Sequence, residues 1–226
     1  MPEYSVPHSI RGVISEDGGK TWGEIYTLVE GKGAESPDFM NVAFGDPCIV
    51  ADRESNRVMV MSCAGNVAYI RGQRDYHQGI ARFYSDDGGK SWSKPTDIAD
   101  DIYSQFDNGK WGPARSMFVA SGRVLQSRYV KVGKYYRLYC AVLQTVANGE
   151  WMNFVLFSDD FGESWSVLGG VDQSPIMKGA DEAKVEELPG GGLLISSRTN
   201  NNGRNFNIFT FSDVKRGEGS WGEMAH

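Results

Sequence analysis

The sequence of 226 residues predicts an all-β protein folded as a β-propeller, and three observations support this prediction. An eight-residue motif recurs three times along the chain, β-prone runs precede each copy, and amphipathic helical windows longer than two turns are absent. The 28 glycines provide the tight turns that connect short strands. A four-stranded unit of about 50 residues or more that repeats around an axis forms a propeller blade.

The repeated motif, hereafter the Asp box, has the pattern S-x-D-x-G-x-[ST]-W and spans residues 15–22, 85–92 and 158–165. A degenerate copy, two residues longer, spans 212–221. Because serine and aspartate oxygens accept hydrogen bonds from turn N–H groups and glycine adopts positive φ angles, each box is expected to form a hairpin turn. Its tryptophan is expected to open the next strand and to pack between neighbouring sheets. The residues with this structural role are Ser15, Asp17, Gly19, Trp22, Ser85, Asp87, Gly89, Trp92, Ser158, Asp160, Gly162 and Trp165.

The strands can be placed in order around these boxes. β-Prone runs directly before the boxes cover residues 10–14, 79–84, 151–157 and 205–211. Between the boxes lie three further strand pairs, namely 47–51 with 57–63, 124–130 with 135–144, and 185–188 with 193–198. With one strand added after each box, every unit contains four antiparallel strands. The chain therefore holds about three and a half blades, and a closed propeller needs at least four.

Composition, charge and cysteine usage exclude several classes of function. A hydrophobic fraction of 40% with 23% charged residues describes an ordinary globular domain, and the net charge of −6 argues against nucleic acid as a partner. The apolar runs are too short for a membrane span, and no signal peptide is visible at the start of the chain. The cysteines and histidines lack metal-ligand spacing, so no metal or organic cofactor is expected, and buried free thiols are expected at Cys48, Cys63 and Cys140.

Strand direction places two charged side chains near each other. Successive strands of a unit alternate in direction, and the Asp box lies at one edge of the sheet. The first strand therefore starts at the opposite edge, and the second strand ends there. A four-residue turn at 189–192 sets Arg198 opposite Ala183 and beside Glu182. This reasoning leaves two interpretations open, a functional site near the propeller axis or an ion pair on the surface.

The same end of the units carries two long segments, 66–78 and 100–115, and the second contains Tyr103, Phe106 and Trp111. Aromatic loops on a rigid scaffold are common places for sugar-binding sites. Since loop aromatics serve packing as often as binding, these three side chains receive no assigned role.

The chain resembles the exo-sialidases of glycoside hydrolase family 33, most closely the type found in gut Bacteroides. The resemblance is carried by the three Asp boxes, by Phe44-Gly45-Asp46-Pro47 ahead of a strand, and by Asp181-Glu182-Ala183-Lys184-Val185-Glu186-Glu187-Leu188 followed by Leu193-Leu194-Ile195-Ser196-Ser197-Arg198. Asp boxes also occur in other glycosidases and in sortilin-type receptors, so the last segment is the more specific. The resemblance extends over nearly the whole chain and implies a six-bladed propeller, of which this chain holds the central part.

The resemblance implies a retaining exo-α-sialidase that releases terminal sialic acid, so sialylated glycans are the expected partners. In the family, three arginines clamp the sialic acid carboxylate, a tyrosine activated by a glutamate attacks the anomeric carbon, and an aspartic acid protonates the leaving oxygen. By this resemblance Glu182 is the activating glutamate and Arg198 is the second clamp arginine. The segment 45–47 matches a part of the family's fold near the site and receives no role.

The other members of this site are not matched in the sequence. In the family, the first arginine and the acid lie ahead of the first box, where Glu3 is the only carboxylate in this chain. The third arginine and the tyrosine lie in a later blade, and none of the ten tyrosines matches. A fragment that is inactive alone is therefore expected, from a protein that the resemblance places in the periplasm or outside the cell. Two alternatives stay open: a non-catalytic Asp-box module that binds glycans or proteins, and a propeller glycosidase that uses two carboxylates.

Overall fold

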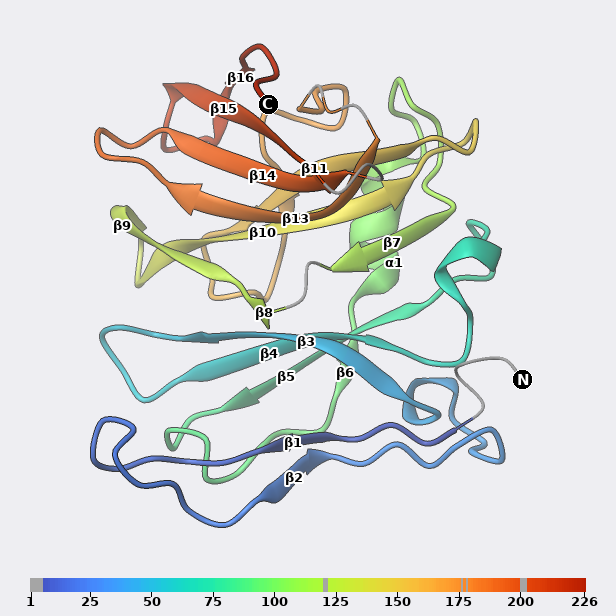
Figure 1. The fold of residues 1–226 in the computed structure, drawn as a ribbon, viewed down its shortest axis with the longest axis vertical. Coiled ribbons are helices and arrows are strands. Elements are labelled where there is room, and N and C mark those ends of the chain that lie inside the picture. The colour runs from blue at the N-terminus through green and yellow to red at the C-terminus, as the bar shows by residue number, and fades with distance from the viewer. Residues whose placement is uncertain (1–5, 120–121, 176, 178, 200–202) are drawn as a thin grey trace.

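The computed structural model describes residues 6–119, 122–175, 177, 179–199 and 203–226, which fold into four β-sheets (Figure 1). The sheets follow one another along the long axis of the molecule, from the N-terminal strands (blue) to the C-terminal strands (red). Helical structure in the described residues is limited to α1 (Ala99–Tyr103) and three 3-10 turns, η1 (Phe39–Asn41), η2 (Tyr69–Arg71) and η3 (Ser104–Phe106). None of these helices is long and apolar enough to cross a membrane. The prediction of an all-β fold is confirmed.

The strands appear where the turn chemistry predicts them. The first sheet pairs β1 (Ile10–Gly12) with β2 (Tyr26–Val29). The second contains β3 (Phe44–Ala51), β4 (Val58–Ala64), β5 (Gly79–Ser85) and β6 (Thr96–Asp97). The third contains β7 (Ser116–Val119), β9 (Leu125–Val132), β10 (Tyr135–Thr145), β11 (Trp151–Ser158) and β12 (Ser166–Val167). The fourth contains β13 (Ala180–Glu187), β14 (Leu193–Thr199), β15 (Arg204–Asp213) and β16 (Glu218–Trp221).

The inner strand of the third sheet is split, which the sequence pattern did not predict. β7 and β9 both pair antiparallel with β10. Along the chain, β8 (Gly122–Arg123) lies between β7 and β9, and it pairs in parallel with β3 of the second sheet. A pairing between segments this far apart in the chain leaves no local periodicity to read. The second and third sheets are therefore joined by backbone hydrogen bonds as well as by side-chain packing.

The β13–β14 hairpin differs by one residue from the predicted register. Ala183 pairs with Ser197, where the sequence predicted Arg198. The Leu188 N–H donates to a backbone carbonyl at 2.8 Å across a three-residue loop, 189–191, so the predicted four-residue turn is wrong. Two successive glycines in that loop have φ angles of 94° and 93°, a left-handed conformation that closes the hairpin one residue earlier.

Three hydrophobic cores fill the spaces between successive sheets, and the box tryptophans contribute to them. Trp92 packs between the first and second sheets, Trp165 between the second and third, and Trp221 between the third and fourth. Each of these rings thus packs on the face of its own sheet that is directed to the preceding sheet. Trp22 belongs to the first sheet and leaves 62% of its surface exposed.

The Asp boxes are closed by hydrogen bonds within the turn, and the second box shows the pattern. The Ser85 hydroxyl donates to Asp87 Oδ1 at 2.7 Å and accepts the Gly89 N–H at 2.7 Å. Asp87 Oδ1 accepts the N–H groups of Lys90 and Ser91, both at 2.9 Å, and Oδ2 accepts the Ser91 hydroxyl at 2.6 Å. The bonds to the aspartate from the serine and from the residue before the tryptophan recur in the first and third boxes.

The degenerate fourth copy keeps its aspartate and its tryptophan. Asp213 Oδ1 accepts the N–H groups of Lys215 at 3.0 Å and Arg216 at 3.2 Å. The Trp221 ring packs edge-on against Phe209, with ring centroids 5.1 Å apart. The looser spacing therefore still forms an aspartate-stabilised turn at the same place in the sheet.

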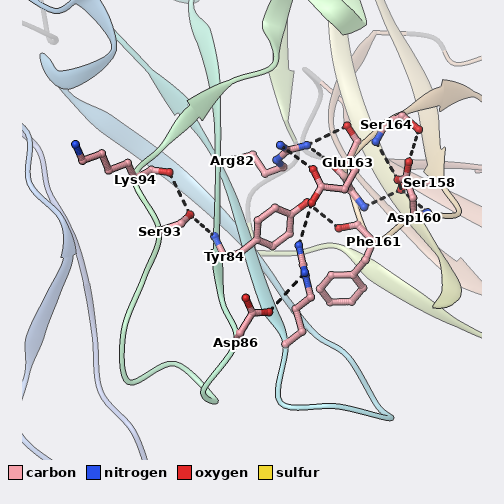
Figure 2. Close-up of polar contacts among 12 residues, drawn as sticks. Arg82, Tyr84, Asp86, Ser93, Lys94, Ser158, Asp160, Phe161, Glu163 and Ser164 are labelled. Atoms are coloured by element: carbon pink, nitrogen blue, oxygen red, sulfur yellow. Dashed lines mark hydrogen bonds and ion pairs between the residues drawn. The ribbon is translucent and has the colours of Figure 1, made fainter. Parts of the chain in front are cut away.

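The third box, 158–165, is anchored to the second sheet, as Figure 2 shows. Arg82 and Tyr84 of β5 donate to backbone carbonyls of the box at 2.7 Å and 3.0 Å. Glu163 of the box accepts a hydrogen bond from Arg57 at 2.9 Å and pairs with Arg82 at 3.1 Å. These contacts fix the position of the third sheet relative to the second.

Candidate functional site

The residues that the sequence singles out lie along the edge of the sheets opposite the Asp-box turns, hereafter the site edge. β13 begins there at Ala180, and β14 ends there at Thr199. Several buried polar side chains lie along this edge: Gln78, Gln144, Asn153, Asp181, Ser197 and Asn205. A few polar groups placed on a rigid scaffold can orient a ligand.

Arg198 is the centre of the charged cluster at the site edge. Its Nη2 donates to Asp181 Oδ2 at 2.9 Å, and its Nε lies 3.5 Å from Glu182 Oε2. The structure thus brings Glu182 and Arg198 together, as the strand directions predict, and adds Asp181, which sequence reasoning left without a role. A bulge in β13 between Ala180 and Ala183 explains the addition, because it breaks the alternation that sends successive side chains to opposite faces.

The cluster is open to solvent on one side. The side chains of Arg198 and Glu182 are 53% and 46% exposed, whereas Asp181 is 13% exposed. An exposed ion pair of this kind adds at most about 1 kcal/mol to folding stability. Arg198 Nη1 has no partner among the described residues, so the guanidinium keeps N–H groups free for an anionic ligand.

Asp181 is held in place by hydrogen bonds to its backbone and side chain. Its Oδ1 accepts the backbone N–H of Glu182 at 2.9 Å, and its own N–H donates to the Ser197 hydroxyl at 3.2 Å. The side-chain amide of Asn153 donates to the Asp181 carbonyl at 2.8 Å. Ser197 and Asn153 are both fully buried. The start of β13 is therefore a rigid support for the exposed guanidinium of Arg198.

Tyr69, in the segment 66–78, reaches the site edge of the third sheet. Its hydroxyl accepts a hydrogen bond from Thr145 at 3.1 Å, and its ring meets Trp151 edge-on with centroids 5.6 Å apart. Burial raises the pKa of Tyr69 above its usual value, so the hydroxyl stays protonated at neutral pH. No role for Tyr69 could be predicted from the sequence beyond its position in the long segment 66–78.

The aromatic residues of the segment 100–115 divide into packing and surface groups. Tyr103 and Phe106 are 0% and 1% exposed and belong to the core between the second and third sheets. Trp111 is partly buried and lines a groove of about 590 Å³ at the site edge. The groove reaches Ala180, the residue before Asp181.

Asp46 is strained at the start of β3. Its φ angle of 50° lies in the left-handed region although it is not glycine, and Pro47 follows it. Strained backbone of this kind concentrates at functional sites. The segment 45–47, which the family resemblance had placed near the site, therefore contains a residue with an unusual backbone conformation.

Metal ligands and thiols do not contribute to this cluster. Across the described parts of the chain, no group of three or more histidine, cysteine, aspartate or glutamate side chains is arranged to hold a metal ion. The cysteines at 48, 63 and 140 are buried and are not joined in disulfides, as the sequence predicts.

The chain matches the family model described as a BNR repeat-like domain over residues 8–213. A sialidase of Micromonospora viridifaciens is 32% identical over 202 residues, and a sialidase of Bacteroides fragilis is 25% identical over 205 residues. The chain belongs to the BNR repeat-like domains of the sialidase type. Relatives from both genera match this sialidase-type domain, so its predicted closeness to the Bacteroides type stays a prediction.

Solved structures share the fold of this sialidase-type domain. A Hadza microbial sialidase superposes with a TM-score of 0.70 at 21% identity over 95% of this chain and 40% of its own. An intramolecular trans-sialidase from Ruminococcus gnavus gives 0.67 at 16% identity over 96% of this chain and 63% of its own. At such identities the likeness establishes the β-propeller fold alone. The alignments with the two curated relatives include 85% and 84% of this chain. They include only 28% and 33% of the relatives' own lengths, so the chain spans about a third of either relative.

Proposed function

We propose that the chain forms the central part of the catalytic domain of a retaining exo-α-sialidase, which hydrolyses terminal sialic acid from glycans. The observation that supports this proposal is the cluster at the site edge, where the open guanidinium of Arg198 lies 3.5 Å from Glu182 and is anchored by Asp181 at 2.9 Å. The match to sialidases over most of the chain supports the same assignment.

The proposed roles follow from the charge of the substrate. Sialic acid carries a carboxylate on its anomeric carbon, and Arg198 is proposed to bind it with charge-assisted hydrogen bonds. The same carboxylate repels an anionic nucleophile, which favours a tyrosine hydroxyl over a carboxylate for the attack. Glu182 is proposed to accept the proton of that hydroxyl.

The geometry argues against a mechanism based on two carboxylates. Asp181 is the acidic side chain next to Glu182, and both of its oxygens are occupied, one by the backbone N–H of Glu182 and one by Arg198. With both oxygens engaged in these contacts, Asp181 is not placed to protonate a leaving group. The tyrosine-based mechanism is therefore the better proposal for this cluster.

The 226-residue chain by itself is expected to give no turnover of a fluorogenic α-sialoside. The reason is that the nucleophilic tyrosine and two of the clamp arginines are not matched by residues of this sequence. The measurement is release of the fluorophore by the purified chain, with the Glu182→Gln variant beside it. Robust turnover by the unaltered chain that Glu182→Gln abolishes would show that these functions reside in residues to which no role has been assigned. Sialoside binding without turnover agrees both with the proposal and with a non-catalytic Asp-box module that binds glycans.

A further inference from the structure

A second groove, of about 610 Å³, lies between the third and fourth sheets at the edge that carries the Asp-box turns. Its walls are the end of β9, the loop 189–191 between β13 and β14, and the segment 210–215, which leads from β15 into the degenerate fourth box. This edge is opposite the one where Arg198 lies (Figure 1). Both flanking sheets contain at least four strands, so the groove does not arise from an incomplete sheet.

Apolar side chains line this groove and remain in contact with water. Tyr129 and Val214 are 58% and 40% exposed, and Phe211 is partly buried. Large apolar side chains that stay accessible within a single groove are typical of a surface that binds another molecule. Tyr129 belongs to the third sheet and Val214 follows the last long strand of the fourth, so a ligand that contacts both side chains bridges the two sheets.

The groove walls are held in place by hydrogen bonds. The Ser127 hydroxyl accepts the backbone N–H groups of Tyr129 at 3.1 Å and Val130 at 2.8 Å. The guanidinium of Arg137, which is fully buried, donates to two successive backbone carbonyls of the fourth box at 2.5 Å and 2.6 Å. A groove that is formed before the ligand arrives lowers the entropic cost of binding.

The loop 189–191 leaves one side of the groove without side chains. Gly190 and Gly191 line the groove with φ angles of 94° and 93°, and the space where a Cβ atom would lie is open at both positions. Backbone without side chains allows the main chain of a ligand to approach closely. An extended peptide fits a surface of this kind.

The lining of the groove is positively charged, although the chain as a whole carries a net charge of −6. Lys131 and Lys215 are the only charged side chains among the described residues that line it. Lys131 is paired with Glu54 at 2.6 Å. The ammonium of Lys215 is exposed and has no hydrogen-bond or ion-pair partner in the described parts of the chain. A free cation beside an apolar surface attracts a ligand that carries a carboxylate.

We infer that this groove binds an acidic peptide segment of a partner protein, with an apolar side chain against Tyr129 and Val214 and a carboxylate on Lys215. A peptide is favoured over a nucleic acid because the lining is mostly apolar and the net charge of −6 repels a polyanion. The residues of the candidate site take no part in this contact, so the inference does not rest on the proposed function.

The test is a titration of the fluorescein-labelled peptide Glu-Glu-Leu-Phe-Glu-Glu with the 226-residue chain, followed by fluorescence anisotropy. Saturable binding is expected, and Lys215→Glu is expected to weaken it by about tenfold. Lys20→Glu is the matched control, because Lys20 is an exposed lysine of the first box and its substitution changes the net charge by the same amount. It should bind the peptide nearly as the unaltered chain does. Absence of saturation, or equal losses of affinity in the two variants, overturns the inference.

The apolar part of the contact has a test of its own. Tyr129→Ala should weaken binding of the same peptide by about tenfold, and the peptide Glu-Glu-Ser-Ser-Glu-Glu should bind the unaltered chain more weakly by a similar factor. Because the Tyr129 side chain is largely exposed, this variant should keep the melting temperature of the unaltered chain. Equal affinities for the two peptides would show attraction between charges alone and would contradict the inference.

Sedimentation velocity distinguishes a partner protein from a second copy of this chain as the occupant of the groove. The unaltered chain is expected to sediment as a monomer. A dimer that Tyr129→Ala dissociates would assign the groove to a second copy and would overturn the proposal of an acidic partner.

Discussion

The guanidinium of Arg198 is both anchored and accessible, and this combination suits it to bind an anion. Asp181 holds one edge of the guanidinium at 2.9 Å, while the side chain as a whole stays 53% exposed. The approach of Glu182 to Arg198 could be predicted, because a short hairpin loop restricts which residues face each other. Asp181 could not be assigned, because the bulge that turns it toward Arg198 has no signature in an alternating pattern.

Removal of the Asp181 carboxylate should weaken sialic acid binding. Asp181→Ala leaves Arg198 free to adopt other rotamers, so the ligand has to order a long side chain on binding. We expect the dissociation constant for N-acetylneuraminate, measured by NMR titration, to rise by about tenfold, which corresponds to ~1.4 kcal/mol. Asp181→Asn keeps an acceptor oxygen and should give a smaller rise. Equal affinities for all three proteins would rule out a positioning role for Asp181.

At the scale of the elements, the Asp boxes are the best-predicted parts of the molecule. The hydrogen bonds that close each turn join residues no more than four apart, so the local sequence determines the turn. The split inner strand β7–β9 and the parallel strand β8 were missed for the opposite reason. The strand β8 pairs with β3, and such long-range partners leave no trace in local turn chemistry or periodicity.

The boxes should make the fold sensitive to acid. Hydrogen bonds from the Thr21 N–H and hydroxyl lower the pKa of Asp17 to about 2 from an ordinary 3.8, and bonds from the hydroxyl and N–H of Ser91 lower the pKa of Asp87. A carboxylate whose pKa is lower in the folded state adds stability above its unfolded pKa, and that stability is lost as the pH falls through the folded value. The melting temperature should therefore fall between about pH 4 and about pH 2.

A pair of neighbouring substitutions isolates this effect. Asp87→Asn removes one box carboxylate and should lower the melting temperature near neutral pH while making the acid-induced fall shallower. Asp86→Asn is the matched control, because Asp86 is 74% exposed and its nearest ion-pair partner, Arg57, lies 3.5 Å away. The measurement is thermal unfolding at a series of pH values. Identical pH profiles for the two variants would contradict the role given to the box aspartates.

At the scale of the whole molecule, the successive sheets are fixed to one another in a stack. Cores between successive sheets, the β3–β8 pairing and the bonds of Arg82 and Glu163 to the neighbouring sheet fix the relative positions of the sheets. The segment 100–115 connects the second sheet to the third. The segment 66–78 connects two strands of the second sheet, β4 and β5, and contacts the third sheet through Tyr69. The charged cluster on the fourth sheet is thereby held in one arrangement before a ligand arrives, which reduces the entropic cost of binding.

The most direct test of the central claim is an NMR titration of the isotope-labelled 226-residue chain with N-acetylneuraminate. The account predicts saturable shifts centred on Asp181, Glu182 and Arg198, and their loss in Arg198→Ala. Arg204→Ala is the control, because Arg204 is exposed and lies opposite Arg198 in the adjacent strand. It should bind as the unaltered chain does. Undiminished binding by Arg198→Ala, or shifts confined to the Asp-box edge, would contradict the account.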